Sequence, residues 1–263
     1  MRSPLNKRLF RELRGEFGKY LVIFILMTLT IGMVSGFLVA DGSMIQAYEE
    51  SFEKYSIENG HFRTEKKMNN AQIQDIEDLG IKLYENYYVE EALTNGSTMR
   101  IFKNRDEVNK VCLMKGKMPE KPGEIGIDRM YADNNDLSVG DEIESGGHTW
   151  KITGLVALSD YSALFSNNND SMFDSVKFGV SVVCPEEFDS CKADQLNYSY
   201  AWKYNTEPKN EKAEKDISED LMEDVAKEVT LEEFVPRYTN QAIIFTGDDM
   251  GGDRSMMIVL LYI

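Results

Sequence analysis

Histidine and cysteine, which most often bind metals or act as nucleophiles, are scarce in this chain of 263 residues. Neither of the two histidines, His61 and His148, belongs to an H-E-x-x-H zinc motif. The three cysteines, Cys112, Cys184 and Cys191, form no C-x-x-C pair, and an odd number does not indicate a disulfide framework. Cys184 and Cys191 are near enough in sequence to pair, but we expect all three thiols to be free.

Motifs for phosphate binding and for nucleophilic catalysis are also missing from the sequence. A P-loop needs a glycine upstream of its G-K-[ST], whereas Gly116-Lys117 lacks that glycine and is followed by Met118. The G-M-V-S-G run at residues 32–36 departs from the G-x-S-x-G elbow of hydrolases and lies inside an apolar stretch. We therefore expect that this chain does not itself hydrolyse ATP through a P-loop.

Two acidic segments carry some of the oxygen ligands that calcium prefers. Residues 133–137 fail the calcium-loop template at its third ligand, which is Leu137. The aspartates of residues 248–253 are interleaved with glycines, and a flexible linker is favoured over a weak cation site. We predict no catalytic residue, no cofactor site and no metal site, so the chain is not expected to be an enzyme.

An uncharged apolar run, residues 20–40, is the strongest structural signal in the chain. A helix of this length measures about 31 Å, which matches the hydrocarbon core of a bilayer. Twelve of its residues are Leu, Ile, Val or Phe, which favours insertion by about 4 to 7 kcal/mol. A cleaved signal peptide has a shorter apolar core and small residues before its cleavage site, where this chain has Leu38. We predict a transmembrane helix over residues 20–41.

Charge is divided unevenly between the two sides of this predicted span. The first forty residues carry six basic and two acidic side chains, so the net charge of −16 leaves −20 for the rest of the chain. Basic flanks stay in the cytoplasm, so we expect a cytoplasmic N-terminus and an extracytoplasmic main domain in the cell membrane. The acidic body lacks a basic cluster, which argues against nucleic-acid binding.

Residues 1–19 place apolar side chains every four positions among basic ones, as in a basic amphipathic helix on the inner lipid surface. The alternative is a basic flank with no defined helix. Within the span, small residues recur every four positions and predict a helix-packing face for another membrane helix. These residues are Thr28, Gly32, Gly36 and Ala40.

The helical period continues beyond the span, through Met44, Tyr48, Phe52 and Tyr55, and predicts a stalk over residues 42–57. The last nine residues, 255–263, read SMMIVLLYI and cover only about 14 Å as a helix. We expect them to begin a second span of a longer membrane protein. The alternative is an apolar C-terminus that folds back on the domain.

Short alternating elements fill the region between the two apolar segments. We predict strands over residues 61–65, 81–89, 98–103, 108–114, 124–128, 149–157, 176–183, 196–204 and 229–238. We predict helices over residues 68–79 and 207–228, a short helical piece through Tyr131 and Ala132, and an exposed loop over 159–175. The fold class is therefore α+β, with the β-rich part between two α/β parts.

Three segments carry a resemblance to a known family: KGKMPEKPGEIGID at 115–128, LSVGDEI at 137–143 and WKITGLV at 150–156. They are similar to the "G-x-x-P-x-x-x-G-E-I" and "l-x-v-G-D-x-I … v-x-G-i-v" segments of FtsX-like, MacB-type ABC transporter permeases. The basic start, the span and the second apolar segment follow the same layout. The motif residues are structural, and no active site is carried over with them.

The resemblance implies a discontinuous α/β subdomain near the membrane with a β-rich subdomain inserted in it. It also implies a separate ABC ATPase subunit, a second permease subunit and a multi-pass full-length protein. The expected domains are a basic helix 1–19, a span 20–41, a stalk 42–57, an α/β subdomain 58–115 with 205–240, an inserted β-rich subdomain 116–204, an exit stalk 241–254 and the start of a second span 255–263. This sequence departs from the family layout by ending within that second span.

Two functions remain open at this point. In the first, the chain is the N-terminal part of a permease that couples ATP hydrolysis elsewhere to movement of an extracytoplasmic domain, for export or mechanotransmission. In the second, it is a membrane-anchored extracellular sensor or ligand-binding domain. An exported hydrolase is disfavoured, because no nucleophile, metal or acid–base set can be assembled.

Overall fold

The computed structural model describes residues 14–145 and 147–260. It divides into two compact units, each described here by itself. One consists of residues 1–48 with 248–263, and the other of residues 49–247. The expected amphipathic helix over residues 1–19 lies mostly outside the described residues.

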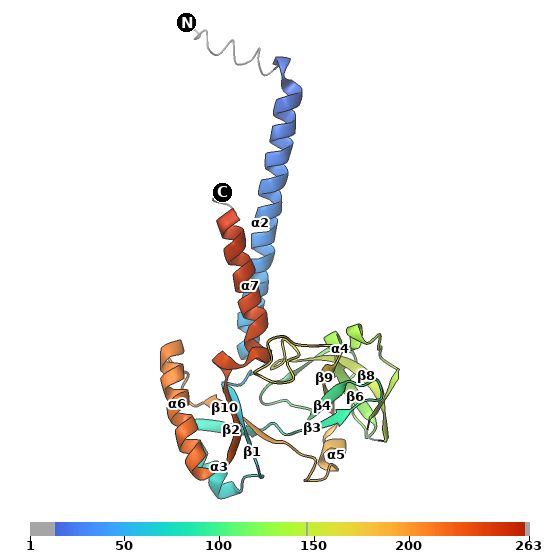
Figure 1. Ribbon diagram of the computed structural model, residues 1–263, viewed down its shortest axis with the longest axis vertical. Coiled ribbons are helices and arrows are strands. Elements are labelled where there is room, and N and C mark those ends of the chain that lie inside the picture. Colours follow the sequence, from blue (N-terminus) through green and yellow to red (C-terminus); the bar gives the residue numbers. More distant parts are fainter. Residues whose placement is uncertain (1–13, 146, 261–263) are drawn as a thin grey trace. The chain divides into compact units, whose positions relative to one another are not determined.

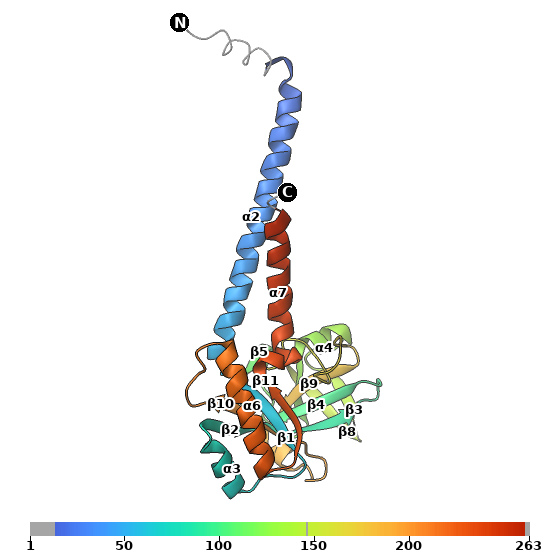
Figure 2. The ribbon, with the colours of Figure 1, turned by 60° about the vertical axis from the view of Figure 1, so that its left-hand side comes forward.

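The first unit is built from two helices (Figure 1). Helix α2, Phe17–Lys54, runs unbroken through the apolar stretch and the predicted stalk, and leaves the helical conformation three residues before the expected end at 57. Helix α7 is Gln241–Leu260, and its later turns run beside α2 in both views (Figures 1 and 2). Among the described residues, α2 alone is long and apolar enough to cross a membrane.

The second unit contains a four-stranded antiparallel sheet with two helices (Figure 1). Its strands, in spatial order, are β11 Leu231–Pro236, β1 Gly60–Thr64, β10 Tyr198–Tyr204 and β2 Ile81–Glu85. Helix α3, Asn70–Glu77, contacts β2, and helix α6, Glu211–Glu228, contacts β11 and α3. A 3-10 turn, Arg237–Thr239, follows β11.

Aromatic rings fill the core of this sheet. Phe62 stacks on Tyr200, and Trp202 stacks on Phe234 with ring centroids 4.8 Å apart. Trp202 is completely buried, and its ring lies over Gly60, where an added Cβ would be only 2.3 Å from ring atoms. Since no larger residue fits there, Gly60 is required by packing.

A seven-stranded mixed sheet forms the rest of the second unit. Its path is β3 Tyr88–Ala92, β4 Thr98–Lys103, β9 Phe178–Val183, β6 Glu124–Asp128, β8 His148–Leu158 and β5 Val111–Gly116, with β7 Glu142–Ser145 paired to β8. Short helices α4, Arg129–Asn134, and α5, Pro185–Asp189, follow β6 and β9 in the chain. All six residues of the central strand β9 are buried.

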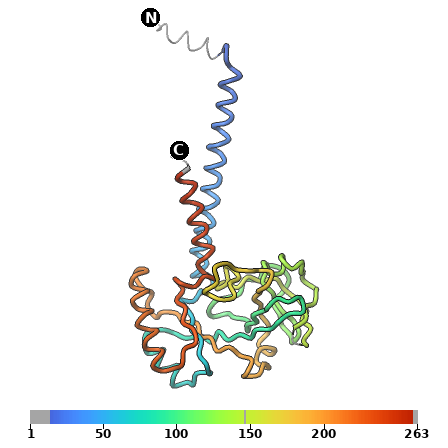
Figure 3. The backbone as a smooth tube through the Cα atoms, viewed as in Figure 1, coloured from blue at the N-terminus to red at the C-terminus, as the bar shows by residue number. Residues whose placement is uncertain are grey.

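Strand pairing divides the chain at points other than the expected subdomain boundaries 115/116 and 204/205. The predicted strand 81–89 is two strands, β2 and β3, which belong to different sheets. The predicted strand 196–204, which was expected in the β-rich subdomain, is β10, and it pairs with β1 and β2 in the four-stranded sheet. Figure 3 shows the chain leaving that sheet after β2 and returning with β10. Periodicity locates a strand but not its partner, and the aromatic residues of β10 complete the core around Phe62.

The loop over residues 159–175 also differs from its expected exposure. Its first half is buried at Asp160, Ala163, Leu164 and Phe165, whereas later residues such as Met172 are exposed. The asparagines and aspartate at 167–170 suggested solvent, but the apolar residues before them pack into the domain.

Candidate functional site

A cleft of about 530 Å³ lies between the two sheets of the second unit. Alternation along the strands creates it, because successive side chains point to opposite faces. On β1, Phe62 points into the aromatic core while His61 and Arg63 line the cleft. On β4, Met99 and Ile101 are buried while Arg100 lines the cleft.

The charged side chains of this cleft are paired across neighbouring strands. Arg100 donates to Glu90 at 2.6 Å, to the Tyr161 hydroxyl at 2.7 Å and to the Ser166 carbonyl at 2.9 Å. Its guanidinium also lies 4.5 Å from the centre of the Tyr88 ring. Arg100 therefore fastens the loop 159–175 to the seven-stranded sheet.

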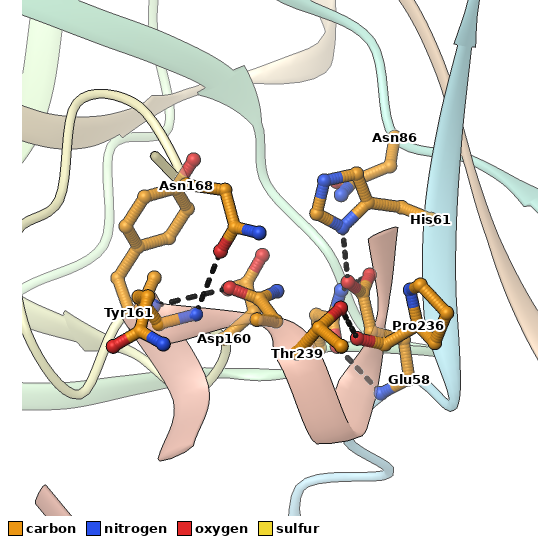
Figure 4. Close-up of polar contacts among 12 residues, drawn as sticks. Glu58, His61, Asn86, Asp160, Tyr161, Asn168, Pro236 and Thr239 are labelled. Carbon is orange, nitrogen blue, oxygen red and sulfur yellow. Dashed lines mark hydrogen bonds and ion pairs between the residues drawn. The ribbon is translucent and has the colours of Figure 1, made fainter. Parts of the chain in front are cut away.

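Glu58 and His61 form an ion pair at one end of the cleft (Figure 4). Glu58 is fully buried, lies 2.6 Å from His61 Nδ1 and accepts from the Asn109 amide at 2.5 Å. Burial lowers the pKa of His61, but the charge of Glu58 and its hydrogen bond raise it by more, so the pKa of His61 lies above its ordinary value. Burial raises the pKa of Glu58, but His61 and Asn109 outweigh it, so that pKa is lowered.

A second buried ion pair joins the loop 159–175 to the segment after β4. Arg105 donates two parallel hydrogen bonds of 2.7 Å to Asp160, and both side chains are less than a tenth exposed. The same guanidinium donates to the Asn86 carbonyl oxygen at 2.8 Å. This bidentate geometry fixes the orientation of both groups.

The loop also holds the beginning of α7. Ser162 donates to the carbonyls of Ala242 and Ile243, and the backbone amide of Gln241 donates to Asn168. Three aromatic rings pack edge to face around this contact, with centroids 5.5 to 5.7 Å apart. They belong to Phe165, Phe173 and Phe245.

The described residues contain no cluster suited to covalent or metal chemistry. No group of three His, Cys, Asp or Glu residues within residues 14–145 and 147–260 could hold a metal ion. The three cysteines are free, as expected, and Cys184 is buried. Burial raises the pKa of Cys191, which disfavours its thiolate. The arrangement is suited to binding through hydrogen bonds.

The helix-packing residues Thr28, Gly32, Gly36 and Ala40 belong to the first unit, on α2, and none of them lines the cleft. All four are exposed on the helix, and nothing lies within 4 Å of a Cβ built on either glycine. The less exposed face of α2 instead contains Val34, Leu38 and the buried Asp41. Packing of the small-residue face against another helix stays a prediction.

Sequence reasoning did not find the cleft residues. His61, Arg100 and Asn240 are far apart in the chain and belong to no common motif. A polar residue at every second position of β1 and β4 was the one available signal, but it is equally typical of a solvated strand face.

Comparison with known proteins gives limited similarity. No family model matches the chain, and no curated protein matches it. Among solved structures, the chain is similar to the periplasmic region of MacB from Actinobacillus actinomycetemcomitans, with 11% identity, 65% of this chain and 85% of that chain covered, and a TM-score of 0.35. It is also similar to the extracellular domain of the noncanonic ABC-type transporter YknZ from Gram-positive bacteria, with 10% identity, 64% and 92% covered, and a TM-score of 0.34. Similarity at these TM-scores carries no argument about function.

Proposed function

We propose that this chain contributes a membrane span and an extracytoplasmic domain to an ABC transporter permease of the FtsX-like, MacB type. A separate ATPase subunit hydrolyses ATP, and a second permease subunit completes the membrane part. The chain itself is not an enzyme. It responds to the ATPase by moving its extracytoplasmic domain, for export or for mechanotransmission.

The observation that carries the proposal is how the family-like segments are used in the fold. Residues 115–128 form the end of β5, a turn and β6, and residues 150–156 lie in β8 between these two strands. Gly116 has a φ of +80°, and a Cβ there would lie 2.3 Å from the Thr153 carbonyl oxygen. A Cβ on Gly154 would lie 2.5 Å from the Lys117 carbonyl oxygen. The two motifs therefore depend on each other through close backbone contact.

Helix α2 supports a role in transmitting motion, because it runs without a break from the apolar run to the domain. The residues that follow this helix are hydrogen-bonded to the segment that precedes β5 of the seven-stranded sheet. The backbone amides of Asn109 and Lys110 donate to the Ser56 and Tyr55 carbonyls. The amide of Glu58 donates to the Asn109 side chain at 2.9 Å. A rigid helix with a fixed end can pass on a displacement that a flexible linker would absorb.

The first test concerns orientation and uses the two partly exposed thiols, Cys112 and Cys191. Intact cells are treated with a membrane-impermeant maleimide, and the purified chain is assayed for label. Labelling of intact cells is the expected result. Labelling that requires cell lysis would place the domain in the cytoplasm and overturn the proposal.

The second test concerns the ATPase and the exposed small-residue face of α2. The protein is purified from native membranes together with any P-loop ATPase, and ATP hydrolysis is measured in proteoliposomes. We expect the ATPase to copurify and the pair of changes Gly32→Leu and Gly36→Leu to reduce its activity, since leucine keeps helices apart. The matched control is Met33→Leu, on an exposed position of the same turn. Unchanged activity in the glycine variant would remove the packing role.

A sensor or ligand-binding domain remains the second candidate, favoured by the polar cleft between the sheets. Such a protein would copurify with a signalling kinase instead of an ATPase.

A further inference from the structure

We infer that the cleft between the two sheets binds a small ligand through a carboxylate or phosphate group. The inference needs only the fold of residues 49–247 and holds whether or not the chain belongs to a transporter. It follows from which hydrogen-bonding groups of the cleft are already used within the protein and which are left over.

Three asparagines of the cleft already accept a hydrogen bond through their side-chain oxygen. Asn168 Oδ1 accepts from the backbone amide of Gln241 at 2.8 Å, and Asn240 Oδ1 accepts from that of Ala242 at 3.1 Å. Asn86 Oδ1 accepts from Arg105 at 2.8 Å. Each partner is an N–H group that can only donate, so the oxygen of each side-chain amide must face it.

The donor side of these amides is left free. Among the hydrogen bonds of residues 14–145 and 147–260, none is donated by Nδ2 of Asn86, Asn168 or Asn240, whose side chains bond through Oδ1. Asn86 and Asn240 are themselves about 95% buried and line the cleft, and Asn86 also lines a neighbouring pocket on the side of β2. Figure 4 shows Asn86 next to His61 and Asn168 across from them.

Cations of the cleft add to this surplus of donors. His61 uses Nδ1 on Glu58, which leaves its other ring nitrogen for the cleft, and this pairing favours the charged imidazolium. Lys177 lines the cleft and is exposed, with no ion pair among the described residues.

The acidic groups of the cleft, in contrast, already have partners. Glu90 accepts from Arg100, and Asp160 accepts two hydrogen bonds from Arg105. Glu233 forms an ion pair with Arg63 at 3.7 Å, without a hydrogen bond, and Asp174 accepts from two backbone amides of its own turn. The free amide donors, with His61 and Lys177, suit a ligand group that only accepts, which is an oxyanion such as carboxylate or phosphate.

The test converts free donors into acceptors without disturbing the fold. Asn168→Asp and Asn240→Asp, combined in one variant, keep the oxygen that accepts from the backbone but replace the amino group by a negative oxygen. Aspartate and asparagine accept equally well from backbone amides at helix starts. The matched control is Asn210→Asp, because Asn210 accepts from the Ala213 amide in the same way at the exposed start of α6.

Binding is measured by isothermal titration calorimetry on the full chain in detergent. Citrate probes carboxylates, inorganic phosphate and glycerol 3-phosphate probe phosphates, and glycerol is the neutral comparison. We expect the natural protein to bind at least one oxyanion and not glycerol, and the double variant to bind it at least about tenfold more weakly. The Asn210 variant should change affinity by less than about twofold.

Thermal unfolding of each variant shows whether it is folded. If the double variant unfolds, Lys177→Gln replaces it, because this side chain is exposed and forms no hydrogen bond or ion pair among the residues that the structure describes. Unchanged affinity in whichever of the two variants is folded overturns the inference, as does the absence of binding to every oxyanion. A preference for citrate or for the phosphates tells which source of oxyanion the cleft accepts.

Discussion

Asp128 offers the sharpest test of the electrostatics in this structure. It ends β6, is 5% exposed and accepts from the Met130 and Tyr131 amides as the N-cap of α4. Burial raises its pKa to about 6, and the two hydrogen bonds and Arg129 only partly oppose this. The change Asp128→Asn keeps an acceptor for the cap and removes the buried charge.

The magnitude follows from the linkage between proton binding and stability. A pKa raised from an ordinary 3.8 to about 6 means that the folded state holds this proton more tightly than the unfolded state. Stability therefore falls as the pH rises from about 4 through 6, by about 3 kcal/mol in all. The Asp128→Asn variant has no carboxyl group to ionise at this position, so its stability does not fall in this pH range. It should be more stable than the natural protein by about 3 kcal/mol at pH 8 and about equally stable at pH 4.

The assay is urea unfolding followed by tryptophan fluorescence at pH 4, 6 and 8. Both tryptophans, Trp150 and Trp202, are buried in the domain and report its unfolding. Asp128→Ala is the comparison, because it loses the cap and should cost about 1 kcal/mol relative to the asparagine variant at every pH. A stability difference between Asp128→Asn and the natural protein that does not depend on pH would refute the reasoning.

Three further predictions concern the same domain and are checked by the same unfolding measurement. Gly60→Ala should destabilise the domain by about 2–3 kcal/mol, because its Cβ would lie 2.3 Å from a buried tryptophan ring. His61→Gln should reduce the free energy of unfolding most between about pH 4.5 and 6.5. The raised pKa of His61 adds its full stabilisation below the ordinary histidine pKa of 6.5, and the lowered pKa of Glu58 adds its full stabilisation above the ordinary glutamate pKa of 4.5. That contribution should be lost as pH rises through the raised pKa of His61 or falls through the lowered pKa of Glu58. Arg105→Met should cost about 3–5 kcal/mol by leaving a buried carboxylate unpaired, and adding Asp160→Asn should recover part of it.

Each of these has an outcome that contradicts it. Gly42→Ala, where a Cβ meets nothing within 4 Å, is the control for Gly60, and equal effects would rule out the clash. A cost of His61→Gln that stays constant from pH 4 to 9 would mean that charge plays no part at that position. If adding Asp160→Asn to Arg105→Met recovers nothing, then the lost packing of Arg105 on Phe102 explains the cost better than charge.

The sequence by itself determined those elements whose signals are local. The apolar run at 20–40 forms one helix because length and composition decide this without any partner. The start of α3 is set by Asn69, which accepts from the Gln72 amide while the Gln72 side chain accepts from the Asn69 amide. The strands Thr98–Lys103 and Glu124–Asp128 have their predicted bounds, since alternation and flanking turns mark them directly.

Only the tertiary structure decided which strands pair and what their faces enclose. β1 pairs with β10 and β11, and these two strands lie more than 130 residues further along the chain than β1. No local pattern therefore identifies them as its partners. The cleft exists because this pairing brings His61 and Arg63 on one sheet and Arg100 on the other into the lining of one cavity. Its free amide groups follow from hydrogen bonds between Asn168 and Asn240 and the start of α7, which form only after the loop and that helix have been brought together.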